Sequence, residues 1–286
     1  MKRQDIRGKI IIVAGATGGI GYPACLQLAK MGAVVVAVGR SKSRLESIIR
    51  KISGYSPSSI FIESDLSRRE SWNEIVDQVF DRFHRIDVLV NCAGVLIPGT
   101  LDTLSDKEVE SVICLNFSNC VRSARAVVPV MKKQHSGQIL FVGSLGGIVP
   151  MPYEALYSAT KFAVRGLSRS LQSELRRYEI CVSHLSPGPV RTSMLAAESA
   201  DRLSTISFAL KPLDAGVVAS AIVDLIERPR EEKIIPGWQG AFAFMLNISP
   251  KVFSLLSPLL HAVGRRNRRQ FRDGILSRPL VAGDLR

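Results

Sequence analysis

The sequence predicts an α/β fold: a doubly wound parallel β-sheet of about seven strands, flanked by helices on both faces and followed by a C-terminal helical extension. Two observations predict it. Short β-branched apolar runs alternate with longer segments of helical periodicity, and a glycine cluster closes the first apolar run. With 286 residues, 46% of them hydrophobic, the chain is long enough for one large domain with a substantial core.

The composition excludes several classes of protein. The five cysteines are odd in number and none is spaced C-x-x-C, and the four histidines are scattered, so we expect reduced thiols and no metal site. The polar opening MKRQDIRGKI does not fit a secretory signal. Together these features favour a cytoplasmic protein.

The first element is an apolar run at residues 9–15, typical of a strand buried on both faces. A glycine cluster, a helical pattern ending at Gly32 and a second strand at 33–39 complete a βαβ unit. A diphosphate approaches a backbone only where side chains are missing, and the following helix offers free N–H groups. A tight turn is the alternative, but this context favours dinucleotide binding by the turn residues Gly15, Thr17, Gly18, Gly19, Ile20 and Gly21.

The second strand ends in Gly39-Arg40-Ser41, without the acidic residue that would bind the adenosine ribose of NAD. Arg40 is placed to face a 2′-phosphate instead, with Ser41 and Arg44 as further contacts. Arginine in a solvated turn is the alternative interpretation. We therefore expect NADP(H) to be preferred over NAD(H).

Further apolar runs at 59–63, 87–90, 137–143 and 180–186 are separated by helical segments at 67–83, about 106–134 and 155–178. Ligands of such sheets lie beyond the carboxyl ends of the strands. Polar and glycine residues gather at those ends: Asp65, Asn91, Gly94, Ser144, Pro187 and Gly188.

Tyr157 and Lys161 share one face of a predicted helix, because residues four apart are neighbours there. An ammonium stabilises a phenolate and lowers the pKa of the phenol, which suits proton exchange with a carbinol oxygen. Ser144, at a strand end, could hydrogen-bond a substrate carbonyl alongside the phenol. Asn116, inside a long helix, could reshape the turn or hold a water. The structural alternatives are a helix surface pair, a turn serine and an exposed asparagine.

The sequence resembles the short-chain dehydrogenase/reductase family over residues 10–192, in the order and spacing of these motifs: the glycine turn, Asp65, Asn91-Cys92-Ala93-Gly94, Asn116, Ser144, Tyr157 with Lys161, and Pro187-Gly188 with Thr192. The resemblance implies a Rossmann-type dinucleotide-binding and catalytic domain over residues 1–237 and an NAD(P)-dependent oxidoreductase. By this resemblance Tyr157 would be the acid–base residue, and Lys161 would lower its pKa and bind the nicotinamide ribose. Ser144 would orient the carbonyl, and Asn116 would hold a water.

The resemblance also implies cofactor contacts from the later strand ends: Asp65, Leu66, Asn91, Ala93, Gly94, Tyr157, Lys161, Pro187, Gly188, Val190 and Thr192. Two positions depart from the family pattern. Cys92 replaces the more usual second asparagine, and Gly18 stands where many NADPH-using relatives carry a basic residue.

The region that would contact the substrate is apolar. Residues 193–212 should form a mobile lid, and apolar side chains occur both in it and beside the expected cleft: Met194, Leu195, Leu203, Ile206, Phe208, Leu210, Val95, Leu96, Ile97 and Met151. Ordinary packing of the lid is the alternative. We expect a hydrophobic or lipid-like carbonyl substrate.

Residues 238–286 form an apolar and basic C-terminal extension, interrupted by Pro250, Lys251 and Pro258. Its arginines contribute to the net charge of +13, and apolar residues beside them suit an anionic membrane surface better than a membrane span. The extension could instead pack over the cleft or a partner subunit, or be a flexible end. The sequence contains no motif typical of nucleic-acid-binding proteins. The two long predicted helices are a candidate interface for a homodimer or homotetramer.

The predicted function is an NADPH-dependent carbonyl reductase or alcohol dehydrogenase acting on a ketone or secondary alcohol. A 3-ketosphinganine-type reductase is one candidate and a 3-oxoacyl carrier-protein reductase is the other. An NADP(H)-binding sensor or scaffold without catalysis is the alternative of a different class.

Overall fold

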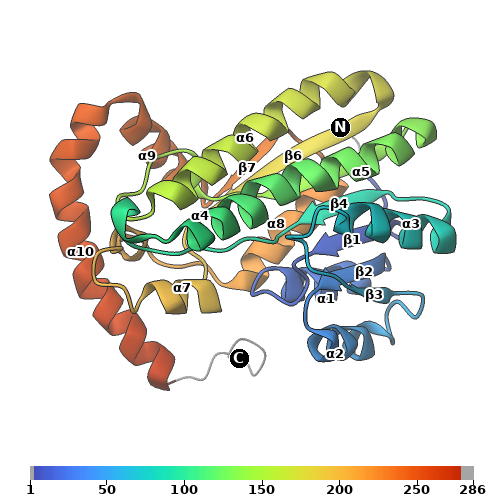
Figure 1. Ribbon diagram of the computed structural model, residues 1–286, viewed down its shortest axis with the longest axis horizontal. Coiled ribbons are helices and arrows are strands. Elements are labelled where there is room, and N and C mark those ends of the chain that lie inside the picture. The colour runs from blue at the N-terminus through green and yellow to red at the C-terminus, as the bar shows by residue number, and fades with distance from the viewer. Residues whose placement is uncertain (1–2, 278–286) are drawn as a thin grey trace.

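A computed structural model describes residues 3–277 and contains a seven-stranded parallel sheet between layers of helices (Figure 1). The strand order is β3-β2-β1-β4-β5-β6-β7, which confirms the predicted doubly wound α/β fold. The strands are β1 (Ile10–Ala14), β2 (Val34–Gly39), β3 (Ile60–Glu63), β4 (Val88–Asn91), β5 (Gly137–Val142), β6 (Ile180–Pro187) and β7 (Glu232–Ile235).

The side chains of each strand alternate between two buried layers. In β1, Ile11 and Val13 pack with one set of helices, while Ile10 and Ile12 pack with the other. The first set is α1 (Gly21–Lys30), α2 (Lys42–Ile52) and α8 (Ala215–Glu227). The second set is α3 (Ser71–Phe83), α5 (Asn119–Gln134) and α6 (Ala155–Leu175). Burial on both faces explains why the strands are continuous apolar runs.

The helix predicted over 106–134 is divided into α4 (Asp106–Ile113), a π-helical turn (Cys114–Ser118) and α5. Asn116 lies in the widened turn, where its side chain bonds the backbone of the loop after β4. A π-turn carries one more residue than an α-turn, and such turns are frequent at functional sites. Asn116 therefore lies at the point where the predicted helix departs from α-helical geometry.

The C-terminal extension is helical, as predicted, and forms α9 (Gly237–Ile248) and α10 (Pro250–Ser277) at one end of the molecule (Figure 1). The helical conformation is interrupted at Ser249, and Pro250 begins the next helix. Proline suits the start of a helix because the backbone N–H that it lacks would have no partner within the helix there. Pro258 lies inside α10 and does not end it. Residues 278–286 of the predicted extension lie outside the described residues.

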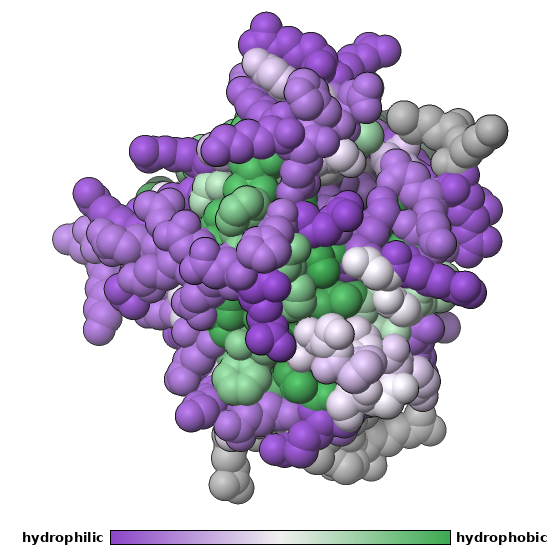
Figure 2. Space-filling model, turned by 90° about the vertical axis from the view of Figure 1, so that its right-hand side faces the viewer, coloured by the Kyte–Doolittle hydropathy of each residue, from purple (hydrophilic) through white to green (hydrophobic). Residues whose placement is uncertain are grey.

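Helices α9 and α10 build a third apolar cluster with the loop after β5, including Leu145, Ile148 and Leu246. None of the helices in residues 3–277 combines the length and apolarity that crossing a bilayer requires. The face of the molecule away from α10 is mostly hydrophilic, with apolar residues showing only in patches (Figure 2).

Candidate active site

The glycine turn after β1 is tightly enclosed. Gly15 has a φ of +77°, and a Cβ there would lie 2.8 Å from the backbone nitrogen of Ala93 after β4. A Cβ on Gly19 would overlap the side chain of Thr192, and one on Gly21 would overlap the backbone of Gly15. These positions accept only glycine, so the backbone at the start of α1 stays open for a diphosphate.

The ends of β2 and β3 form the predicted adenosine side. The Asp65 carboxylate accepts hydrogen bonds from the backbone N–H of Ser67 at 3.0 Å and from its hydroxyl at 2.8 Å. These bonds lower the pKa of Asp65, and the nearby Arg40 guanidinium lowers it further. Leu66 is buried beside it. Ser41 precedes α2, and its hydroxyl lies 3.3 Å from that of Ser43.

Asn91 lies at the end of β4 and is fully buried. Its side-chain oxygen accepts from the backbone N–H of Ala93 at 3.2 Å and from Asn119 at 3.2 Å, and its amide donates to Ser123. The side chain therefore shapes the loop over residues 91–94. Asn91 would therefore affect a bound cofactor through the shape of this loop.

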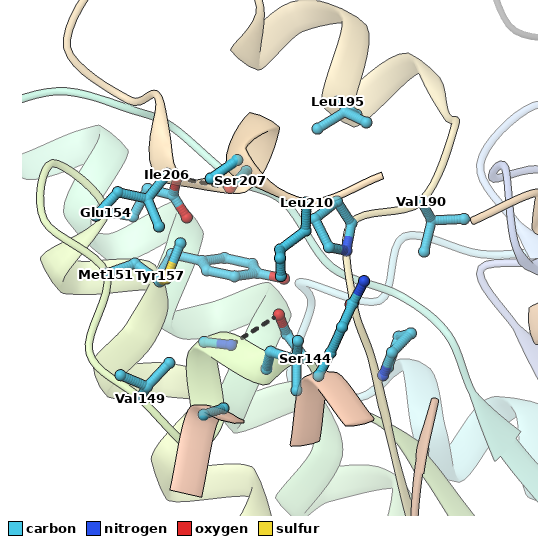
Figure 3. Close-up of a pocket in the computed structure, with 18 of the residues that line it drawn as sticks. Ser144, Val149, Met151, Glu154, Tyr157, Val190, Leu195, Ile206, Ser207 and Leu210 are labelled. Carbon is cyan, nitrogen blue, oxygen red and sulfur yellow. Dashed lines mark hydrogen bonds between the residues drawn. The ribbon is translucent and has the colours of Figure 1, made fainter. Parts of the chain in front are cut away.

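Ser144 and Tyr157 meet in the same cavity (Figure 3). Ser144 follows β5, and its hydroxyl accepts the backbone N–H of Gly146 at 3.0 Å. Tyr157 lies in the first turn of α6 and points its phenol toward the Ser144 hydroxyl (Figure 3). One turn further along α6, the Lys161 Nζ lies 5.5 Å from the centre of the Tyr157 ring. The fold thus gathers the predicted phenol, hydroxyl and ammonium.

Burial dominates the protonation of this group. It raises the pKa of Tyr157, which the bond with Ser144 partly offsets, and it lowers the pKa of Lys161. We expected Lys161 to lower the pKa of Tyr157, and this effect is not found in the protein alone. The Lys161 ammonium donates to the carbonyl of Val142 at 3.2 Å. At neutral pH the phenol is therefore protonated and can act as an acid.

Asn116 lies close to these groups. A Cβ on Gly94 would lie 3.2 Å from the Asn116 side-chain oxygen and 3.5 Å from the Lys161 Nζ, so glycine lets both approach the loop after β4. The Asn116 oxygen accepts from the Val95 N–H at 2.8 Å, and its amide donates to the Val95 carbonyl and the Thr160 hydroxyl. These bonds engage the Asn116 side chain within the protein, and the water predicted at this residue stays a prediction.

Pro187 ends β6 and Gly188 follows it, and both line the cavity together with Val190 and Thr192. The Thr192 hydroxyl caps α7 (Ser193–Glu198) by accepting the N–H of Leu195 at 3.4 Å. The cavity has a volume of about 150 Å³, and its wall is mainly apolar. Of the apolar residues predicted near the substrate, six line it: Leu96, Met151, Met194, Leu195, Ile206 and Leu210.

The lid and the extension close the cavity together. Phe242, Ala243 and Leu246 of α9 and Phe253 and Leu260 of α10 line it, so the extension packs over the cleft. The lid is held to α10 by a hydrogen bond between the Thr205 hydroxyl and His261 Nδ1 at 2.7 Å. The Asn267 amide also donates to the carbonyl of Phe208 at 3.1 Å.

Four polar residues of this wall were not predicted: Glu154, Glu198, Ser207 and Gln239. Glu154 stands three residues before Tyr157, Glu198 and Ser207 come from the lid, and Gln239 comes from α9. Nothing in the local sequence marks them, because only the folded chain brings the lid and α9 to Tyr157. Among residues 3–277, no three His, Cys, Asp or Glu side chains gather as a metal site would require.

A glycine turn at the end of the first strand of a parallel sheet, a serine and a tyrosine at one cavity, and a lysine one helical turn beyond the tyrosine define an NAD(P)-dependent oxidoreductase. The short chain dehydrogenase family matches residues 9–203, and the chain belongs to that family.

Known proteins agree with this assignment. The chain is 29% identical over 225 residues to an uncharacterized oxidoreductase of Staphylococcus epidermidis, covering 78% of this chain and 93% of the relative. It is 32% identical over 184 residues to a 3-ketodihydrosphingosine reductase of Bacteroides thetaiotaomicron, covering 64% of this chain and 65% of the relative. A solved metagenomic short-chain oxidoreductase in complex with NADP is 27% identical, with a TM-score of 0.70 over 81% of this chain and 98% of the other.

Proposed function

We propose that this oxidoreductase is an NADPH-dependent carbonyl reductase of hydrophobic ketones, which also oxidises the corresponding secondary alcohols. The observation that carries the proposal is the position of Ser144 and Tyr157 on the wall of a mainly apolar cavity. NADPH, when bound, supplies the hydride that reduces the carbonyl carbon, and leaves as NADP⁺.

The residues of the chain manage the carbonyl oxygen. Ser144 donates a hydrogen bond that holds the oxygen beside Tyr157. As negative charge develops on that oxygen, the protonated phenol gives it a proton, which yields the alcohol. Lys161 stabilises the resulting phenolate, and Asn116 fixes the loop that faces Lys161.

The preference for NADPH is supported by charge at the end of β2. Arg40 is close enough to influence the Asp65 carboxylate, and β2 ends without an acidic residue to bind a ribose hydroxyl. The NADP complex of the metagenomic relative is consistent with this preference.

The substrate class is supported by the cavity and by one relative. The apolar lining contributed by the lid, α9 and α10 suits a long alkyl chain. The Bacteroides relative is named as a 3-ketodihydrosphingosine reductase, which favours a 3-ketosphinganine-type substrate. A 3-oxoacyl carrier-protein reductase remains the second candidate, because the basic surface could dock an acidic carrier.

The test is the loss of NADPH absorbance with a series of aliphatic ketones of increasing chain length. We expect kcat/KM to increase with chain length. Reduction of 3-oxoacyl carrier protein but not of free ketones would favour the second candidate. Protein that binds NADPH but reduces no ketone in the series would instead be a sensor or scaffold.

We also propose that α9 and α10 rest on an anionic membrane surface. Ile248 is 81% exposed and Leu255 78%, and five arginines follow on α10: Arg265, Arg266, Arg268, Arg269 and Arg272. Apolar side chains beside a basic cluster suit the interface of an anionic bilayer. A homodimer or homotetramer through α4, α5 and α6 is a further proposal, which light scattering during gel filtration tests.

A further inference from the structure

Two buried carboxyl groups face each other in the wall of the catalytic cavity. Glu154 precedes α6 and Glu198 ends α7 in the lid, and each is 4% exposed. The Ser204 hydroxyl bonds to the Glu154 carboxylate and lies 3.0 Å from that of Glu198. The Ser207 hydroxyl lies 3.3 Å from Glu154 (Figure 3).

Ser204 has one proton and two carboxyl neighbours, so it can donate to only one of them. The other carboxyl group must itself be protonated to bond the serine oxygen. Burial raises the pKa of both glutamates. The Glu154 charge raises the pKa of Glu198 further, whereas hydrogen bonds with Ser204, Glu198 and Ser207 lower the pKa of Glu154. These opposite effects favour a proton on Glu198 that the two carboxyl groups share.

Among the salt bridges of the described residues, none involves Glu154 or Glu198, so no cation in this part of the chain pairs with them. Buried carboxylates are usually paired with a cation, because an isolated buried charge is costly. The unbalanced negative charge thus lies on the wall of a cavity that must admit a ligand.

A second, independent feature of the same cavity also calls for a hydrogen-bond donor. Gln239 of α9 lines the cavity and is 1% exposed, and its side-chain oxygen has no hydrogen-bond partner. Buried polar atoms without partners are rare in folded proteins. A ligand could donate to this oxygen, and could also add a charged donor to the glutamates, whose protein partners are the neutral hydroxyls of Ser204 and Ser207.

The glutamate pair and the phenol of Tyr157 line the same cavity. Glu154 immediately precedes α6, and Tyr157 lies three residues further along the chain. Burial is the main cause of the raised pKa of Tyr157, and the negative charges of Glu154 and Glu198 raise it further. A group bound by the pair would therefore share the cavity with the carbonyl that Tyr157 protonates.

We infer that Glu154 and Glu198 bind an ammonium group next to the substrate carbonyl, so that the preferred substrate is an amino ketone with a long apolar chain. The inference rests on the proposed reductase function and names the substrate class of the same site. The ammonium takes the place of the shared proton and leaves both carboxylates charged and paired. The apolar chain then fills the space lined by the lid, α9 and α10.

The test compares three ketones of equal chain length: 2-aminododecan-3-one, dodecan-3-one and 2-acetamidododecan-3-one. We expect the wild-type protein to show a kcat/KM for the amino ketone about tenfold to a hundredfold above that for the plain ketone, as a charged hydrogen bond would give. The acetamide keeps an N–H donor but loses the charge, and should lose the advantage.

Variants then assign the preference to the pair. Glu198→Gln should lower the ratio of the two kcat/KM values at least about tenfold, and Glu154→Gln should act in the same direction. Glu227→Gln is the matched control, because Glu227 is buried but bonds Arg3 away from the cavity and should keep the ratio.

Each outcome decides the question. Equal or faster reduction of the plain ketone by wild type, or an acetamide as good as the amine, overturns the ammonium site. A preference that survives in Glu198→Gln overturns the assignment to the pair. Wild-type protein that reduces none of the three contradicts the proposed function instead, so the two failures are distinguishable. The wild-type comparison needs no variant to fold.

Discussion

Gly264 of α10 lies directly against the backbone carbonyl of Thr205 in the lid, so that a Cβ at position 264 would overlap that oxygen. The contact is backbone against backbone, and neither side has a flexible group that could move aside. It explains how a long C-terminal helix comes close enough to the lid to share the wall of the cavity. Two helical faces approach this closely only where the side chain is a hydrogen.

Gly264→Ala should therefore loosen the lid. We expect the free energy of unfolding to fall by about 1–3 kcal/mol, the usual cost of overpacking, and KM for ketones to rise. Thermal unfolding and steady-state kinetics measure these two changes. Gly166→Ala in α6 is the matched control, because no atom lies within 4 Å of its Cβ position. It should stabilise the protein by about 0.5–1 kcal/mol through helix propensity, and equal effects of the two variants would contradict the packing argument.

Tyr157→Phe removes the proton donor and keeps the ring. We expect kcat to fall by at least about a hundredfold, because a positioned acid contributes that much or more. The Kd for NADPH, measured by fluorescence titration, should change less than about tenfold, since the hydroxyl lost is at most a single contact. A variant that retains most of the wild-type kcat would show that another group protonates the product.

Arg40→Asp should shift the cofactor preference toward NADH. An aspartate would repel a 2′-phosphate and accept a hydrogen bond from a free ribose hydroxyl. We expect the ratio of kcat/KM for NADPH to that for NADH to fall by about tenfold or more. Arg50→Asp makes the same change in charge on an exposed residue further along α2 and should leave the ratio alone. An unchanged ratio in Arg40→Asp would exclude this arginine from phosphate recognition.

The Glu198→Gln variant should gain stability relative to the wild-type protein as the pH rises. The folded pKa of Glu198 is raised, by burial first and by Glu154 second, above its usual value of 4.5. A group with a raised folded pKa contributes its full stability below the unfolded pKa and loses it as the pH rises through the folded pKa. Glutamine does not titrate, so the difference in unfolding free energy should grow in favour of the variant.

Urea unfolding from about pH 5 to about pH 8 measures this difference. A difference that stays constant, or that shrinks with rising pH, would show that Glu198 is not held protonated in the folded chain. The measurement is independent of turnover, because it needs no substrate.

The double variant Arg266→Glu/Arg269→Glu should release the protein from anionic vesicles. Each arginine near a negatively charged surface contributes about 1 kcal/mol to binding, so the loss should exceed tenfold in partition coefficient. Sedimentation with phosphatidylserine-containing vesicles measures it, and vesicles of phosphatidylcholine alone provide the baseline. Arg50→Glu/Lys107→Glu carries the same charge change on other exposed helices and should still bind. Equal binding by both double variants would contradict a membrane role for α10.

The sequence predicts the sheet and the site at strand ends because both depend on local patterns. Each β-branched run is a strand, and the glycine turn at Gly15, Asn91 and Ser144 stand where their strands end. The juxtaposition of Tyr157 and Lys161 follows from helical spacing alone. Asn116 was a harder case, since the single helix expected there is split by the π-turn that its side chain occupies.

The remaining parts of the site depend on distant contacts. The meeting of Glu154 with Glu198 is set by how the lid folds back over α6, and the place of Gln239 by the packing of α9 beside β7. Composition does not distinguish the three interpretations of the extension, because an apolar helix has the same sequence pattern whether it packs over a cleft or lies on a membrane. Only the contacts with the lid place it over the cleft.

The catalytic residues of the cavity and the residues that close it come from different stretches of the chain. Ser144 and Tyr157 precede residue 190, whereas the parts of the lid, α9 and α10 that close the cavity come from residues 193–260. Exchanging that later stretch between related enzymes would retarget them to other molecules while their hydride-transfer machinery stays the same. Changes in about a quarter of the sequence are then enough to diversify what such a protein consumes.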